Sequence, residues 1–426
     1  MRLEVFGENL CALVTASALA SSGHQVGLVV RDATLAHDIA SGRSGFSEPG
    51  LDGLLAEQLG AGRLSVAEHS AQQPLDCAFL AFAPSELERA EAVVVALASS
   101  QKHLVIISQS TFPVGTCERL QAVAEASATG AGHIVVSLPD LLQEGAALQG
   151  FLRPGHWLLG CDNADAERRV REILRPFNRR RDSVLVMRPR EAEFTKFAVT
   201  GMLATRLSYM NDLANLADAL LVDIEKVRRG LGADPRIGEA YLYPGCGFGG
   251  QSFSRDVMRL ADSLEQSGSA SDLLDEVLAI NERQKEVLFR KLWQHYQSDL
   301  AGREVALWGV SFKPGVSAID NAPALRMLDA LWAQGVRVRV HDPKAMPTLA
   351  EWAGERDDLV LCDDPYQAAA GADALCLLTE WKPYWSPDFK RLKDEMRQPL
   401  LLDGRNIYDP EFVRSVGFTY FGVGRQ

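Results

Sequence analysis

Short apolar runs alternate with longer amphipathic segments over the first 190 residues. The runs LEVFG (3–7) and QVGLVV (25–30) have the length of buried strands, and the Ala-rich segment 10–22 between them has a helical pattern that stops at Gly23. Further strands are predicted at 77–81, 104–108, 133–137 and 156–159. Strands that alternate with helices are typical of a doubly wound, mostly parallel sheet.

The middle of the chain has a different pattern. Apart from Gly201, almost no Gly or Pro interrupts residues 191–229, which predicts long helical structure. A loop is predicted at 234–256, and a second helical stretch runs from about 270 to 295. This helical middle would serve as a linker and a dimer surface, because its amphipathic face would otherwise be exposed.

The last third repeats the first pattern. EVALWG (304–309), a helix at 323–334 and VRVRVHDP (336–343) echo the opening strand–helix–strand unit, although any two domains of this class would look alike to this extent. The predicted fold is α/β, with two Rossmann-like doubly wound domains joined by a helical central dimerisation domain. The predicted domains are residues 1–190, 191–300 and 301–426.

Composition narrows the class of protein. The chain has 426 residues, 47% hydrophobic and 23% charged, with a net charge of −12. This acidic balance disfavours nucleic acid and anionic membranes as partners, and no apolar run reaches the roughly 18 residues of a membrane span. No charged-then-apolar leader precedes the first strand, so no secretion signal is expected. The seven cysteines are scattered without a C-x-x-C pair, which predicts neither disulfides nor a zinc site and favours the cytoplasm.

The segment GENLCA (7–12) follows the first predicted strand, where a dinucleotide-binding turn reads G-x-G-x-x-G. Gly7 matches the first glycine, Asn9 replaces the second and Ala12 is a tolerated variant of the third. The Asn9 side chain occupies the place where a pyrophosphate should approach. Glu8 adds negative charge near the helix N-terminus that should receive phosphate.

The end of the second strand carries a further departure. The acidic residue that binds the adenosine ribose in such domains aligns with Val30, which is followed by Arg31 and then by Asp32, two positions too late. A strand–helix unit that no longer binds a dinucleotide explains this segment at least as well as a working cofactor site.

Ordered motifs then appear along nearly the whole chain. They are SEPGLDGLL (47–55), SQSTFPVGT (108–116), LPDLLQEG (138–145), the helix 191–216, DPRIG (234–238), YPGCGFGGQSFSRD (243–256), SFKPG (311–315), TEW (379–381) and DGRNIYDP (403–410). In this order they resemble the motifs of the UDP-glucose/GDP-mannose 6-dehydrogenase family. So many ordered motifs are far more specific than one glycine pattern.

The resemblance implies a four-electron oxidation. In this family the C6 alcohol of a nucleotide hexose becomes a carboxylate at the expense of two NAD molecules. A cysteine thiolate captures the intermediate aldehyde, and the resulting thioester is hydrolysed by water. The resemblance also implies a homodimer in which Arg236 reaches the neighbouring subunit's sugar site.

The sequence departs from the family at the nucleophile, because Ser252 stands at the cysteine position. A serine hydroxyl is far less acidic than a thiol and needs a dedicated base. Cys246, in the same glycine-rich segment, is either a relocated nucleophile or a small filler, and the filler is favoured. Further departures are Asp140 for a glutamate, Thr200 for an asparagine, Ala83 before Pro84 for a threonine, and Asp320 for an arginine near the NAD phosphates.

The resemblance assigns three groups of candidate site residues. The catalytic group is Ser252, Lys196, Asp256, Thr111, Asp140, Glu144 and Thr200, with the lysine stabilising negative charge on oxygen and Asp256 helping to place or activate water. The NAD group is Gly7, Asn9, Ala12, Val30, Asp32, Pro84 and Asp320. The nucleotide-sugar group is Arg236, Tyr243, Gly249, Gly250, Phe312, Lys313 and Arg405. No metal site is expected.

Three functions remain open from the sequence. The protein is an active dehydrogenase with an atypical site, a non-catalytic member that binds a nucleotide sugar and regulates or partners an active paralogue, or an enzyme that stops at the aldehyde. The losses concentrate at the NAD turn and at the nucleophile, while several retained residues belong to the sugar side. The second function is therefore preferred, with NAD binding weak or lost.

Overall fold

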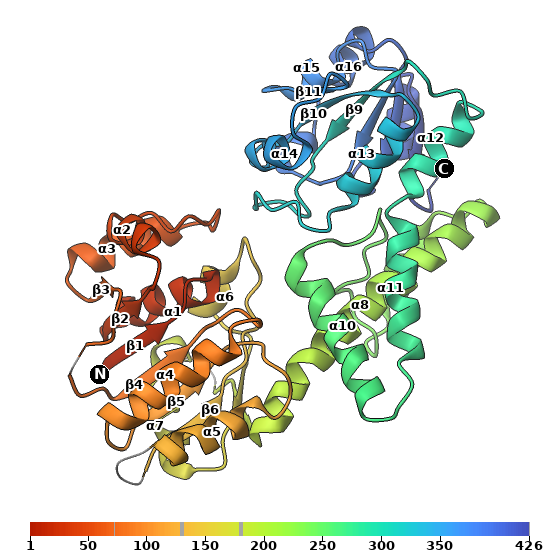
Figure 1. Cartoon of the computed structure of the whole chain (residues 1–426). Coiled ribbons are helices and arrows are strands. Elements are labelled where there is room, and N and C mark those ends of the chain that lie inside the picture. Colours follow the sequence, from red (N-terminus) through yellow and green to blue (C-terminus); the bar gives the residue numbers. More distant parts are fainter. Residues whose placement is uncertain (72, 128–131, 179–181, 426) are drawn as a thin grey trace. The chain divides into compact units, whose positions relative to one another are not determined.

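Two separate sheets organise the chain, one in each of two units, Met1–Ala198 and Val199–Gln426 (Figure 1). The computed structural model describes residues 1–71, 73–127, 132–178 and 182–425. Two sheets with helical segments between them confirm the predicted fold class. The domain boundaries at 190 and 300 stay a prediction.

The first unit holds an eight-stranded sheet in the order β3-β2-β1-β4-β5-β6-β7-β8. Its strands are β1 (Arg2–Phe6), β2 (Gln25–Val29), β3 (Leu64–Ala67), β4 (Cys77–Leu80), β5 (Val105–Ser108), β6 (Ile134–Ser137), β7 (Trp157–Gly160) and β8 (Val184–Met187). All neighbours pair in parallel except β6 with β7. The chain runs outward from β1 to β3 and returns to β4 on the other side of β1, which creates the switch point where ligands bind in such sheets.

Helices cover both faces of this sheet. They are α1 (Leu10–Ser21), α2 (Ala33–Ala40), α3 (Leu51–Gly60), α4 (Leu87–Ser100), α5 (Thr116–Ser127), α6 (Ala147–Leu152) and α7 (Ala164–Leu174), followed by the 3-10 turn η1 (Arg175–Phe177). One buried cluster joins α1, α3, α6 and α7 to the sheet, and a second joins α4 and α5 to it. The predicted strands of this part all lie on observed strands, whereas β3 and β8 were not predicted.

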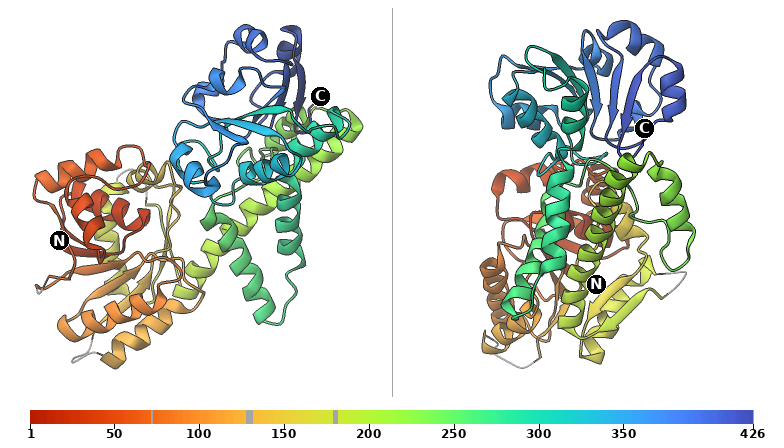
Figure 2. Two further views of the ribbon diagram at one scale, coloured as in Figure 1. Left: turned by 45° about the horizontal axis from the view of Figure 1, so that its top comes forward. Right: turned by 90° about the vertical axis from the view of Figure 1, so that its right-hand side faces the viewer.

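The helical segment consists of α8 (Pro189–Leu220), α9 (Ile224–Ala233), α10 (Gln251–Gln266), α11 (Asp272–Gln284) and α12 (Val287–His295) (Figure 2). The predicted helix 191–229 is broken at Leu221, whose φ of 57° lies in the left-handed region. The loop predicted at 234–256 ends earlier, because α10 begins at Gln251. Val257 and Ala261 are buried one helical turn apart, a period that the preceding glycine run concealed.

The second unit holds a parallel six-stranded sheet in the order β11-β10-β9-β12-β13-β14. Its strands are β9 (Glu304–Trp308), β10 (Arg337–His341), β11 (Leu359–Leu361), β12 (Ala374–Leu377), β13 (Leu400–Asp403) and β14 (Thr419–Gly422). Its helices are α13 (Pro323–Ala333), α14 (Met346–Ala353), α15 (Pro365–Ala369), α16 (Phe389–Glu395) and α17 (Pro410–Ser415), with the 3-10 turn η2 (Lys382–Tyr384). The predicted echo of the opening pattern is therefore a second strand–helix–strand unit.

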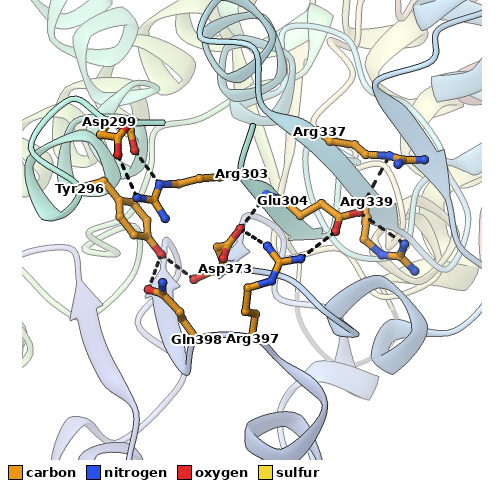
Figure 3. Close-up of polar contacts among 9 residues, drawn as sticks. All are labelled: Tyr296, Asp299, Arg303, Glu304, Arg337, Arg339, Asp373, Arg397 and Gln398. Carbon is orange, nitrogen blue, oxygen red and sulfur yellow. Dashed lines mark hydrogen bonds and ion pairs between the residues drawn. The ribbon is translucent and has the colours of Figure 1, made fainter. Parts of the chain in front are cut away.

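An ionic cluster lies at the amino-terminal edge of the second sheet, where β9 and β12 begin (Figure 3). Arg397 donates to Asp373 at 2.8 Å, and the Asp373 carboxylate also accepts from the Glu304 backbone N–H at 2.9 Å. Tyr296, which follows α12, donates its hydroxyl hydrogen to the Asp373 carbonyl at 2.8 Å. The Tyr296 bond fastens the end of the helical segment to the edge of the sheet opposite the strand ends that usually bind ligands.

No helix within the described ranges has both the length and the apolar content needed to cross a bilayer.

Candidate functional site

The turn after β1 is built as a dinucleotide-binding turn requires. Gly7 has a φ of 149°, and a Cβ at this position would lie 2.1 Å from the Ala81 carbonyl oxygen. Only glycine therefore lets the turn pass so close to the end of β4. Asn9 is the N-cap of α1, and its Oδ1 accepts from the Ala12 N–H at 3.0 Å. The Asn9 side chain is thus folded onto its own helix, at the end where a pyrophosphate binds in such domains.

The end of β2 carries an unexpected carboxylate. Val30 is fully buried in the core, and the Asp32 side chain caps α2 by accepting from the Leu35 N–H at 2.9 Å. Glu8 instead reaches this strand end and accepts from the Arg31 N–H at 2.6 Å. The turn, the start of α1 and this carboxylate together fit a dinucleotide in outline. Sequence reasoning missed the Glu8 contact because it assigned the charge to the helix N-terminus.

Two catalytic candidates of the first unit interact electrostatically. Burial raises the pKa of the half-buried Asp140, and the positive charge of Lys196 on α8 opposes this shift. Asp140 Oδ1 also accepts from the Leu142 N–H at 2.6 Å, which fixes the loop after β6. The Cys11 thiol lies beside this carboxyl, and its pKa is raised, first by burial and then by the charge of Asp140. The side chains of Asp140 and Lys196 therefore lie close enough to interact, and their catalytic roles stay a prediction.

Two buried carboxylates fasten the loops that carry Thr111 and Glu144. Glu193 on α8 accepts from the N–H groups of Gly115 at 2.6 Å and Cys117 at 2.7 Å. In the loop after β6, Gly145 donates to Glu48 at 2.7 Å. Glu48 and Glu193 thus satisfy backbone N–H donors in the loops that carry Thr111 and Glu144. Within these loops Thr111 is half-buried, while Glu144 is exposed.

The loop of residues 243–250, in the second unit, has no regular structure, yet several of its backbone groups are hydrogen-bonded. Asn211 on α8 accepts from the Gly245 N–H at 2.9 Å, and Gln284 on α11 donates to the Gly245 carbonyl at 2.8 Å. Asn281 accepts from the Phe248 N–H at 2.8 Å and donates to the Phe248 carbonyl at 3.0 Å. Buried amide side chains therefore hold this loop in one shape.

The second sheet completes the same loop. Arg405, after β13, donates to the Gly247 carbonyl at 3.1 Å. A Cβ at Gly249 would lie 2.7 Å from the Asn321 carbonyl oxygen, and one at Gly250 would lie 2.9 Å from the Phe312 ring. The structure thus brings together four predicted sugar-side residues: Gly249, Gly250, Phe312 and Arg405. Both glycines are required because the loop passes so close to the segment after β9.

Ser252, the residue predicted to stand at the family's nucleophile position, lies in the first turn of α10. Ser252 is exposed there, and its Oγ accepts from the Arg255 guanidinium at 3.3 Å. Asp256 follows one helical turn later and is buried. A guanidinium donates hydrogen bonds and cannot take up a proton, so this contact does not activate the serine hydroxyl.

A buried lysine beside this helix is a residue that sequence reasoning missed. Lys285, directly after α11, is only 1% exposed and donates to Glu282 at 2.6 Å and to Asn321 Oδ1 at 2.5 Å. Asn321 in turn donates to the Ser254 hydroxyl at 2.9 Å. Burial lowers the pKa of Lys285. The sequence signal was present but ambiguous, because a Glu–Lys pair three residues apart usually lies on a solvated helix face.

Three of the other predicted residues, Arg236, Tyr243 and Asp320, are exposed. Arg236 follows α9 with its side chain 87% exposed and pairs with Asp234 at 2.7 Å. Tyr243 and Asp320 are exposed, although the Asp320 carbonyl accepts from the Gly250 N–H at 2.8 Å. The remaining candidates are placed as follows: Thr200 is buried on α8, Pro84 is half-buried after β4, and Lys313 has its Nζ 5.3 Å from the centre of the Phe312 ring.

All seven cysteines are buried. Cys246 is fully buried in the core of the second unit, with its Sγ 3.8 Å from the Leu378 carbonyl oxygen, and burial raises the pKa of its thiol. A buried thiol with a raised pKa is a poor nucleophile, so the geometry favours the filler interpretation of Cys246. Among the described residues, no three His, Cys, Asp or Glu side chains are grouped so as to hold a metal ion.

Comparison with known proteins identifies the same family as the sequence motifs, with matches in all three parts of the chain. Models of the UDP-glucose/GDP-mannose dehydrogenase family match residues 1–178 (NAD binding domain), 190–283 (central domain) and 306–410 (UDP binding domain). The UDP-glucose 6-dehydrogenase of Pseudomonas aeruginosa is 41% identical over 100% of this chain and 98% of its own length. That of Rhizobium meliloti is 32% identical over the full length of both.

The fold has close solved counterparts. A UDP-glucose dehydrogenase from Pyrobaculum islandicum matches with a TM-score of 0.90 and 28% identity, over 100% of this chain and 98% of that one. A second structure, the UDP-D-ManNAc dehydrogenase of Pyrococcus horikoshii, has the same fold, with a TM-score of 0.84 at 22% identity. On the family models and the two full-length relatives, this chain belongs to the UDP-glucose/GDP-mannose dehydrogenase family.

Proposed function

We propose that this protein binds a nucleotide sugar and that its NAD-dependent oxidation of the sugar to a carboxylate is lost or strongly impaired. Its role would then be regulatory, or that of a partner subunit to an active paralogue. The observation that carries the proposal is Ser252, an exposed hydroxyl on α10 at the place of the family's thiol. UDP-glucose is the first candidate ligand, because two full-length relatives are UDP-glucose 6-dehydrogenases.

Retained sugar binding is supported by the 243–250 loop. Its buried polar backbone groups have partners, and Gly249, Gly250 and Arg405 form the contacts that fix its path. The UDP binding domain of the family, matched over residues 306–410, supports a uridine nucleotide at this part of the chain.

Loss of acid formation is supported by the chemistry of the second oxidation. The family route requires a group that captures the aldehyde and later leaves from an acyl intermediate, and a thiolate does both well. The described partner of the Ser252 hydroxyl is Arg255, which cannot accept its proton. A bound nicotinamide dinucleotide would still supply a hydride acceptor for the first oxidation.

Weak NAD binding is the second part of the proposal. The Asn9 side chain occupies the N-terminus of α1, and Asp320 places an exposed negative charge where the family has an arginine. Losing one charge-assisted hydrogen bond costs about 1.5–3 kcal/mol, or roughly ten- to a hundredfold in affinity.

An active enzyme that forms a nucleotide uronate is the alternative. The electrostatic interaction of Asp140 with Lys196 and the retained Asp256 favour it, as do the names of the relatives. The two functions differ in one product, the carboxylate. An active dehydrogenase forms it, and a protein that only binds the nucleotide sugar does not.

Calorimetric titration tests the proposed ligand. UDP-glucose or GDP-mannose should bind with a measurable heat, and Lys313→Ala should weaken that binding about tenfold through loss of a cation from the sugar side. Lys390→Ala, an exposed lysine on α16, is the matched control and should leave the affinity unchanged. Absence of heat with both nucleotide sugars would refute retained binding.

Thiol labelling tests whether a relocated cysteine acts as the nucleophile. Because all seven cysteines are buried, native protein should react slowly with iodoacetamide, and all seven should react after unfolding. Labelling is counted by intact mass, and the modified cysteine is identified by mass spectrometry of the digested protein. Rapid modification of Cys246 in the native protein would contradict the filler interpretation. It would support Cys246 as the nucleophile of a four-electron oxidation to the acid.

Substitutions that restore the family residues distinguish loss of the thiol nucleophile from weak NAD binding. Ser252→Cys alone should produce no NADH, since the thiol acts only after a first hydride has been transferred. Asn9→Gly, Asp320→Arg and Ser252→Cys combined should produce NADH, measured by absorbance with UDP-glucose or GDP-mannose. Val30 is left unchanged because its side chain is buried. Rapid NADH formation by Ser252→Cys alone would show that the NAD side is intact.

We also propose a homodimer through α8. Met202, Tyr209, Leu216 and Leu220 are each more than half exposed and follow one another at seven- and four-residue steps along this helix. Light scattering at micromolar concentration should give twice the chain mass, and Leu216→Glu should give monomers. Leu273→Glu, at an exposed apolar position on α11, is the control that should stay dimeric. A monomeric parent protein would rule the dimer out.

A further inference from the structure

The end of β2 decides which dinucleotide a Rossmann-like domain accepts. An acidic side chain at this point binds the adenosine 2′-hydroxyl, whereas a nearby arginine accommodates a 2′-phosphate. Here the acidic position holds Val30, which is fully buried, and Arg31 follows it. On these two residues alone, the sequence would favour a 2′-phosphorylated cofactor.

The structure supplies a carboxylate from another element. β1 and β2 pair in parallel up to Phe6 and Val29, so the turn after β1 and the end of β2 lie at the same edge of the sheet. The Glu8 side chain crosses from the turn to that strand end. Its Oε1 accepts from the Arg31 N–H at 2.6 Å and from the Asp32 N–H at 3.3 Å.

A guanidinium from the other side of β1 holds the same oxygen. Arg89 on α4 donates to Glu8 Oε1 at 2.7 Å and to Glu86 Oε1 at 2.7 Å, and its guanidinium carbon lies 5.2 Å from the centre of the Phe82 ring. Arg89 is thereby fixed at the switch point between β1 and β4. The Arg89 contact, followed by the backbone bonds, lowers the pKa of Glu8, so its carboxylate is ionised at neutral pH.

The N–H groups of Arg31 and Asp32 and the Arg89 guanidinium form a binding site for one anion. The Glu8 carboxylate occupies this site. A cofactor 2′-phosphate would have to displace Glu8 or lie beside a second negative charge, and either arrangement is unfavourable. All three described bonds to Glu8 end on Oε1, so Oε2 keeps its capacity to accept from a ribose hydroxyl.

We propose that Glu8 is the ribose-binding and cofactor-selecting carboxylate of this chain: it replaces the acid lost at Val30 and keeps the site specific for a dinucleotide without a 2′-phosphate. This inference rests on the dinucleotide-binding part of the proposed function. It concerns selectivity, and overall NAD affinity remains limited by Asn9 at the pyrophosphate end.

Calorimetric titration of the full-length protein with NAD and with NADP, at one ionic strength and without nucleotide sugar, tests the proposal. The parent protein should bind NAD at least about tenfold more tightly than NADP. Glu8→Gln keeps the side-chain shape and removes the charge, so it should weaken NAD, strengthen NADP, and reduce or reverse the ratio. Glu91→Gln, which removes a carboxylate of α4 paired with Arg119, should leave the ratio unchanged.

The outcomes distinguish this inference from the proposed function. Equal affinity of the parent protein for NAD and NADP overturns the inference, even if Glu8→Gln does not fold. A folded Glu8→Gln with an unchanged ratio shows that Glu8 is a structural link to Arg89, and it also overturns the inference. Binding of a nucleotide sugar with no binding of either dinucleotide removes the inference and leaves sugar binding intact. Selective NAD binding without sugar binding removes only the proposed sugar ligand.

Discussion

The second unit depends on the need to satisfy the backbone of a buried loop that forms neither helix nor strand. Between Gly245 and Gly250 the chain passes through the junction of α8, α11 and the second sheet, and each unmet N–H or C=O there would cost about 1–3 kcal/mol. Asn211, Asn281 and Gln284 supply amide partners from the helices, and Arg405 supplies a guanidinium from the strand end. The shape of the loop is therefore fixed by hydrogen bonds from neighbouring elements, and none of these bonds involves the Ser252 side chain.

In the first unit too, the residues that hold the loops in place differ from those that would carry the chemistry. Gly7 keeps the turn against the end of β4, and Glu48 and Glu193 keep the loops after β6 and β5 in place. Asn9 and Val30, by contrast, depart from the residues expected at a dinucleotide-binding turn and at the following strand end. A substitution at a ligand-contacting position costs little stability, whereas one at a backbone-bonding position would leave buried polar groups unpaired.

The motif assignments of site residues stay predictions. The sequence predicted six strands of the first sheet and two of the second, because these buried strands leave short apolar runs, whereas β11, β12, β13 and β14 were not predicted. It did not predict that α10 begins at Gln251, since the glycine run before it hid the helical period. The contacts of Glu8 and Lys285 could not be predicted from the sequence for a different reason. The direction in which a turn carboxylate points, and the burial of a lysine beside a glutamate, depend on neighbours that come from distant parts of the chain.

The central claim is that this chain keeps the family's sugar site and lacks its route to the acid. The most direct measurement is the uronate formed by the unmodified protein, by mass spectrometry, after incubation with NAD and UDP-glucose or GDP-mannose under conditions where the sugar is bound. The account predicts no nucleotide uronate above a protein-free control. Catalytic accumulation of the uronate, with two NADH for each sugar consumed, would contradict it.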